Sequence, residues 1–137
     1  MKKLPVILVI AMLIIVSKVD CFAQSSEART RELQGEWIVT RLQAGSEIVI
    51  LSEPPFSYWV EMMIIFDGNN YMQTSKNPGT GIINITERGV FHIESDTILI
   101  TRDDGVSQLF SYTIREKNLT MRMNIEGEEV VMISRKQ

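Results

Sequence analysis

The sequence predicts an all-β protein, a single antiparallel up-and-down β-barrel of about 8–10 strands that follows a short N-terminal helix. Three observations lead to this prediction. From residue 36 to the C-terminus, apolar side chains recur with a period of two, as in strands with one buried face. The connections between these segments are about two to four polar residues long, so consecutive strands are expected to pair as hairpins. The chain has one cysteine, so packing and strand pairing must stabilise the fold without an internal disulfide.

The N-terminal segment is predicted to be a cleaved secretory leader. Two lysines precede an apolar run over 4–16, which is shorter than the about 20 residues that a membrane-spanning helix needs. Small residues at Cys21 and Ala23 favour cleavage after Ala23, which gives a signal peptide at 1–23 and one domain at 24–137. The product would be exported to the periplasm or the medium. The alternative is lipidation of Cys21, which would make the protein an envelope lipoprotein and is the one route by which we expect a membrane association.

Charge and composition exclude several classes of function. The net charge is −3, and removal of the lysine-rich leader makes the remainder more acidic, so nucleic acid is not an expected partner. His92 is the only histidine, and no cysteine remains after the leader, so neither a histidine-rich metal site nor a thiol nucleophile is expected. Asp103 and Asp104 precede a glycine and are better explained by a hairpin turn than by a calcium loop. We therefore expect no cofactor, no metal and no catalysis.

The first part of the domain is expected to contain a helix and two strands. A serine begins and a glycine ends the polar run over 25–33, which indicates a short helix. The alternation that begins at residue 36 places Trp37, Val39 and Arg41 on one face of a strand. A second apolar run over 48–51 ends before Pro54-Pro55, where a regular strand cannot continue.

The segment 58–67 has the strongest alternation in the chain and is expected to form one strand. Its predicted buried face contains Tyr58, Val60, Met62, Ile64 and Phe66. Trp59, Met63 and Ile65 lie on the opposite side, here called the Trp59 face. Apolar residues on both sides predict that this outer face is covered by the helix, a loop or a partner subunit.

The remaining strands are expected to be short and evenly spaced. Asp, Gly and Asn form a turn at 67–70, because these residues tolerate the positive φ angles of tight hairpins. The strands that follow are predicted at 71–74, 81–85, 90–93, 97–102, 107–115, 119–124 and 129–135.

The opening of the first strand, Leu33-Gln34-Gly35-Glu36-Trp37, resembles that of the lipocalins and of the small bacterial lipocalin-like proteins. The resemblance implies that Gly35 and Trp37 belong to the Gly-x-Trp motif of that family, in which the tryptophan closes one end of the barrel. It also implies that an arginine near the end of the last strand packs across the indole ring, and Arg135 stands at that position. The chain is shorter than a typical lipocalin and has no long C-terminal helix, so the compact bacterial version is the one implied.

The functional hypothesis is that the barrel binds a small apolar or amphipathic molecule in its lumen. Flexible thioethers adapt to irregular apolar partners, and several methionines are predicted on strands. The residues expected to line the lumen are Val60, Met62, Ile64, Phe66, Phe110, Tyr112, Met121, Met123 and Met132. The alternative is that they fill a solid core, which a barrel this small favours. The protein would then be an envelope structural or interaction module that binds a protein partner or a second copy through the Trp59 face, or acts through the Pro54-Pro55 loop.

Overall fold

The structure is a computed structural model that describes residues 26–137. Residues 26–33 form a helix, as the serine-to-glycine pattern predicts. The predicted leader, its cleavage site and Cys21 lie outside the described residues. Leu33–Gln137 forms one compact unit that contains all the strands of the described chain. In the part of the chain from residue 26 onward, no helix is long and apolar enough to span a bilayer.

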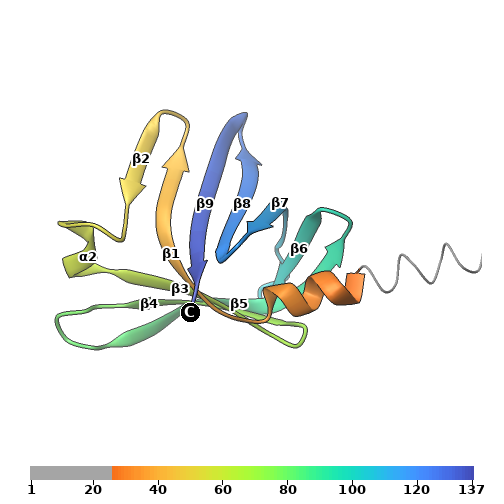
Figure 1. Ribbon diagram of the computed structural model, residues 1–137, viewed down its shortest axis with the longest axis horizontal. Helices are drawn as coiled ribbons and strands as arrows, with labels where there is room; N and C mark the ends of the chain where they lie inside the picture. Colours follow the sequence, from red (N-terminus) through yellow and green to blue (C-terminus); the bar gives the residue numbers. More distant parts are fainter. Residues whose placement is uncertain (1–25) are drawn as a thin grey trace, which may run out of the picture. The chain divides into compact units, whose positions relative to one another are not determined.

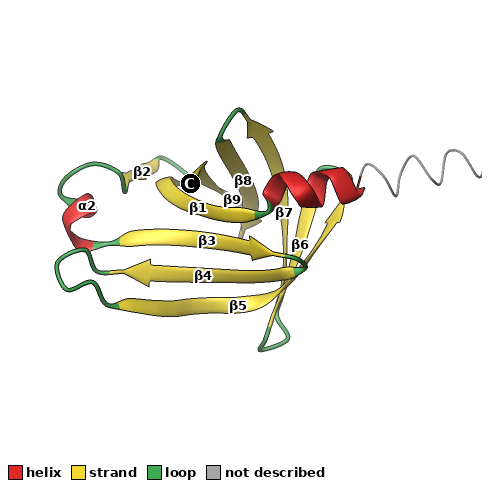
Figure 2. Cartoon of the chain, turned by 60° about the horizontal axis from the view of Figure 1, so that its bottom comes forward, coloured by secondary structure: helices red, strands yellow, loops and turns green. Residues whose placement is uncertain are grey.

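This unit contains nine strands and one short helix, shown in Figures 1 and 2. The elements are β1 (Gly35–Ala44), β2 (Glu47–Ile50), α2 (Phe56–Trp59), β3 (Glu61–Asp67), β4 (Asn70–Lys76), β5 (Ile83–Glu94), β6 (Thr97–Arg102), β7 (Ser107–Arg115), β8 (Asn118–Ile125) and β9 (Glu128–Lys136).

The strands form a closed barrel. From β3 to β9 each strand pairs in antiparallel orientation with the next, and β1 pairs with β3 on one side and with β9 on the other. Eight strands therefore close the barrel, and β2 adds a ninth by pairing with the second half of β1. The predicted antiparallel up-and-down barrel is confirmed. Closure pairs the edges that an open sheet of this size would leave exposed.

A bulge at Thr40 decides which side chains of β1 face the interior. The pairing of β1 with β9 shifts between Val39 and Arg41, and beyond that point Leu42 packs against the core. Thr40 fills the irregularity: its hydroxyl donates to the Ile133 carbonyl at 3.1 Å, and its own carbonyl accepts the Leu51 amide at 2.8 Å. The expectation that Arg41 shares a face with Trp37 and Val39 is therefore wrong, because one extra residue reverses the alternation.

The segment predicted as one strand over 58–67 is a helical turn followed by a strand. The amide of Val60 donates to the Phe56 carbonyl at 3.0 Å, and regular pairing starts only at Glu61. Tyr58 is 66% exposed instead of belonging to the buried face. Prolines 54 and 55 have no N–H to offer to a sheet, so the chain forms a local turn before the strand begins.

In β5, by contrast, two predicted strands are one. Ile83–Glu94 is continuous, with a bulge at Thr86 where Gln73 pairs with Glu87 and Thr74 with Ile85. Gly89, predicted to belong to a connection, lies within the strand where β6 approaches closely. A Cβ atom at Gly89 would lie 2.1 Å from the carbonyl oxygen of Thr101, so only glycine fits at this corner of the barrel.

Trp37 is buried, as predicted, and anchors the end of the barrel at which β1 begins. Trp37 is 1% exposed, and its indole Nε1 donates a hydrogen bond to the Leu33 carbonyl at 2.8 Å. The cation over the ring is the Lys136 ammonium, 5.4 Å from the ring centroid. Arg135 is exposed and pairs with Ile38, so the arginine that the resemblance implied is replaced by the next residue along β9.

Candidate functional site

The residues predicted to line the lumen lie at different depths. Ile64, Phe66, Tyr112 and Met121 are buried in the core. Val60, Met62, Phe110 and Met132 are half-buried and pack against that core. Met123 is half-buried and lies opposite Val130 toward the end of β8. The structure thus brings the predicted set to the core and its border.

The two ends of the barrel differ in how completely their interiors are packed. At the end where β1 begins and β9 ends, Leu33, Trp37 and Leu119 are fully buried, and Ile114 beside Leu119 is half-buried. Phe66 and Phe91 pack edge to face in the same core, with ring centroids 4.8 Å apart. At the opposite end, here called the mouth, the inner apolar side chains are half-buried. They are Leu42, Val49, Val60, Met62, Met123 and Met132.

One wall of the interior is polar on the mouth side. Gln73 and Glu87 are directly paired across β4 and β5, on the same face as buried Tyr71. Arg102 follows Ile98 and Ile100 on the inner side of β6, and it pairs with Gly89. Inner apolar residues on β1, β2, β3 and β9 therefore face a wall that carries an amide, a carboxyl and a guanidinium.

The hydrogen bonds of this wall leave one group unpaired. The Tyr71 hydroxyl donates to Gln73 Oε1 at 3.0 Å. Arg102 binds Asp104 with two donors, and its Nε lies 3.1 Å from Oδ1. Glu87 Oε1 is buried and has no hydrogen-bond partner among the described residues. The carboxyl of Glu87 is thus the group of this wall that has a buried oxygen without a hydrogen-bond partner among the described residues.

The pKa values of these groups follow from burial and from the Arg102–Asp104 contact. Burial raises the pKa of Glu87 above its usual value, and Arg102 opposes this effect. Burial, reinforced by the charge of Glu87, also raises the pKa of Tyr71. The hydrogen bond from Arg102 lowers the pKa of Asp104. The guanidinium is thus already matched to a carboxylate, while Glu87 favours its neutral form more than an exposed glutamate does.

A cavity of about 250 Å³ adjoins the polar wall. Its lining comes from the bulge in β5 and from the end of β6, and the residues are Thr86, Glu87, Arg88, Arg102, Asp103 and Asp104. Sequence reasoning missed this group. The alternation of Ile98 and Ile100 could have placed Arg102 inside, but nothing in the local pattern of β5 reveals the bulge that turns Glu87 inward.

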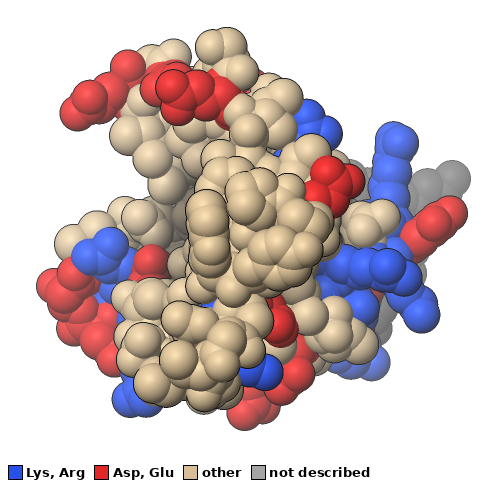
Figure 3. All heavy atoms as spheres, turned by 90° about the vertical axis from the view of Figure 1, so that its left-hand side faces the viewer, with Lys and Arg blue, Asp and Glu red and all other residues tan. Residues whose placement is uncertain are grey.

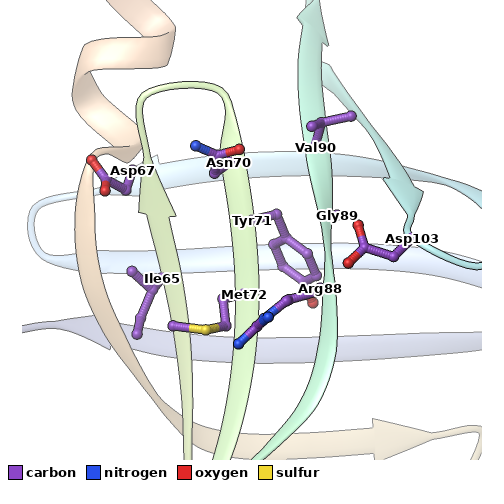
Figure 4. A pocket seen from close by; sticks show the side chains of 9 residues that line it. All are labelled: Ile65, Asp67, Asn70, Tyr71, Met72, Arg88, Gly89, Val90 and Asp103. Atoms are coloured by element: carbon purple, nitrogen blue, oxygen red, sulfur yellow. The ribbon is translucent and has the colours of Figure 1, made fainter.

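A larger depression of about 350 Å³ lies on the outer surface of β3, β4 and β5 (Figure 4). The strand register arranges its borders in two rows across the sheet, one of Asp67, Asn70 and Val90 and the other of Ile65, Met72 and Arg88. Asp103 lies beyond β5 at one end of the groove. This groove combines apolar and charged side chains, and Tyr71 and Gly89 complete its lining.

The other residues considered for chemistry do not form a site. His92 is exposed, and its Nε2 lies 3.7 Å from a carboxylate oxygen of Glu94. Asp104 accepts the amide of Val106 at 3.1 Å, as expected for a hairpin turn. Among residues 26–137, no three His, Cys, Asp or Glu side chains are grouped so that they could hold a metal ion.

Comparison with known proteins supports the fold. No family model matches the chain, and no curated protein matches it. An uncharacterized protein from Bacteroides eggerthii has a similar structure, with a TM-score of 0.56 and 16% sequence identity over 77% of this chain and 99% of that chain. The fluorescent protein UnaG aligns with a TM-score of 0.44 and 10% identity over 79% of this chain and 99% of its own. At these identities the first similarity shows a shared fold.

Proposed function

We propose that this protein is an exported, non-catalytic, lipocalin-like barrel that binds a small apolar or amphipathic molecule on the mouth side of its interior. The observation that carries the proposal is the unequal packing of the two ends. One end is closed around Trp37, whereas the inner side chains at the mouth remain half-buried. A ligand that covers half-buried apolar surface on an inner face is stabilised by about 25 cal/mol for each Å² of apolar surface removed from water.

The polar wall supports an amphipathic ligand. An apolar body would lie against Met62 and Met132, whose flexible side chains adapt to its shape. A polar group on the ligand would lie toward Glu87 and Gln73. Since Arg102 is already bound by Asp104, this wall favours a hydroxyl, amine or amide over a carboxylate.

The alternative function is an envelope module with a filled core that acts through contacts at the surface. The observation that favours it is the exposure of Trp59, which is 63% accessible on α2. In that case the mouth residues would rearrange little and would exclude small apolar probes.

The first test is native mass spectrometry of the protein isolated from the envelope or medium of its host, followed by extraction of any bound molecule. A stoichiometric apolar molecule would support the proposal and would identify the ligand class. N-terminal sequencing of the same sample tests export, because cleavage should leave Gln24 as the first residue.

A fluorescent long-chain alcohol and the matching fluorescent fatty acid provide the second test. Met132→Trp should abolish binding of the alcohol by filling the mouth, whereas Val131→Trp on the neighbouring outer position should preserve it. The wild type should bind the alcohol more tightly than the acid at pH 7. An unliganded natural protein that binds neither probe would contradict the proposal and favour the filled core.

A further inference from the structure

Two neighbouring connections at the mouth expose large apolar side chains. The first is α2, where Tyr58 is 66% and Trp59 is 63% exposed. The second is the connection between β4 and β5 together with the first residue of β5, where Ile82 is 59% and Ile83 is 60% exposed. These are among the most exposed large apolar side chains of the described chain, and we call the two connections together the apolar tip.

The strand register places the two parts of the tip side by side. Glu61, which follows α2, pairs with Lys76, and Lys76 pairs with Ile83 at the start of β5. Both connections therefore leave the same end of three adjacent strands. Figures 1 and 2 show α2 and the β4–β5 connection next to each other at this end.

The tip lacks charged side chains. No Asp, Glu, Lys or Arg occurs in 54–60 or in 77–86, and Glu53, Glu61, Lys76 and Glu87 border these segments. Figure 3 looks onto this end and shows a broad uncharged area at its centre, with acidic and basic side chains mostly toward the edges. An occupant of this surface must therefore be uncharged or zwitterionic, because neither an anionic nor a cationic surface would find a matching charge.

The size of the tip disfavours a second copy of the chain as the occupant. A fully buried aromatic side chain contributes about 150–250 Å², and Tyr58 and Trp59 are about two-thirds exposed; with the two isoleucines, the four side chains therefore offer on the order of 500 Å². A stable protein interface needs roughly 800 Å² from each partner. Insertion into a lipid surface has no such requirement, since individual side chains enter the apolar phase independently.

The residue types match the interfacial region of a bilayer. Tryptophan and tyrosine combine an apolar ring with a polar N–H or O–H, and both are enriched where lipid headgroups meet hydrocarbon. The isoleucines of the second connection supply branched aliphatic groups at the same end of the barrel. No group with a full charge would need to leave water when these side chains insert.

We propose that the apolar tip docks on a zwitterionic lipid surface, with Trp59 and Tyr58 at the headgroup level and Ile82 and Ile83 beside them. This docking brings the mouth of the barrel close to the bilayer. If the interior carries an apolar ligand, as proposed above, the ligand would have a short path between the barrel and the lipid. The docking itself does not depend on that ligand.

Trp59 fluorescence gives a direct test with phosphatidylcholine vesicles. Trp37 is 1% exposed and should change little on docking, so a blue shift of the emission reports Trp59. Phosphatidylcholine brominated on the upper acyl carbons should quench the emission. Absence of both effects at millimolar lipid would overturn the proposal.

Sedimentation with the same vesicles tests the residues. Tyr58→Ser/Trp59→Ser and Ile82→Ser/Ile83→Ser should each weaken partitioning about tenfold or more. Leu109→Ser removes an apolar side chain of 58% exposure on β7 and should leave partitioning unchanged. Every variant has the same N-terminal segment, so any vesicle binding through that segment is equal in all of them, and differences between variants report the apolar tip.

Three outcomes would contradict the proposal. They are equal vesicle binding by all variants, binding that requires anionic lipid, and a dimer in solution that Trp59→Ser dissociates while vesicles remain unbound. Binding of the soluble fluorescent alcohol by Tyr58→Ser/Trp59→Ser should stay within about twofold of the wild type. The docking proposal and the proposed ligand site can therefore fail separately.

Discussion

Replacement of Ser134 by alanine should stabilise the protein. Ser134 lies on β9 between buried neighbours, opposite Val39 of β1 and Leu119 of β8, and is 1% exposed. Its hydroxyl oxygen is buried and has no hydrogen-bond partner among residues 26–137. Since folding removes this hydroxyl from water without replacing its hydrogen bond, the native state is destabilised by about 1–3 kcal/mol.

The substitution also has a small cost. Removing one oxygen atom leaves a space of about 10 Å³, which costs roughly 0.2–0.3 kcal/mol at the usual penalty for cavities. The net expectation for Ser134→Ala is therefore an increase of about 1–3 kcal/mol in the free energy of unfolding. For a domain of about 100 residues this corresponds to a rise in Tm of at least about 4 °C.

Urea unfolding followed by circular dichroism measures this change, with calorimetry as a second readout. Ser111→Ala on the exposed side of β7 is the matched control, because it makes the same chemical change where the hydroxyl is solvated. The control should change the free energy by less than about 0.5 kcal/mol. A loss of stability of 1 kcal/mol or more in Ser134→Ala relative to the control would show that the hydroxyl has a native partner and would refute the reasoning.

Three further predictions concern the barrel corner, the indole contact and the polar wall. Gly89→Ala should destabilise the fold by about 3 kcal/mol or more in urea unfolding, because its Cβ would overlap the backbone of β6, whereas Gly79→Ala in the exposed connection should cost much less. Lys136→Gln should cost about 0.5–1 kcal/mol by removing the cation above the indole, and an equal loss in Arg135→Gln would contradict the assignment. Burial raises the folded-state pKa of Glu87, so the wild type should lose stability relative to Glu87→Gln as pH rises from 3 to 7, and a gain over that range would show that the sign is wrong.

The candidate site was predictable from the sequence only in part. Alternation correctly brought Ile64, Phe66, Tyr112 and Met121 to the core, because the strands that contain them are regular over those residues. It could not distinguish a packed centre from a half-buried mouth, since residues on both have the same period. That difference depends on how far each strand extends toward one end of the closed barrel.

The polar wall and the apolar tip illustrate why the rest was missed. Glu87 faces inward because a bulge adds one residue to β5, and Trp59 leaves the sheet because two prolines precede a local helical turn. The helical turn at Trp59 interrupts an alternation that looks continuous in the sequence. The bulge before Glu87 makes the single strand β5 look like two strands. A rule based on alternation assigns the wrong side to every residue beyond such an interruption.

The sequence by itself determined the all-β class, the antiparallel up-and-down order and the burial of Trp37. These follow from local causes, namely the alternation of apolar side chains, short polar connections and a tryptophan at the start of the first strand. The tertiary structure decided the bulges at Thr40 and Thr86, the choice of Lys136 as the cation over the ring, and the inward position of Glu87 beside Arg102. Each of these depends on register against a strand that is distant in sequence or bent by its neighbours, and closure of the barrel sets that register by requiring β1 and β9 to pair.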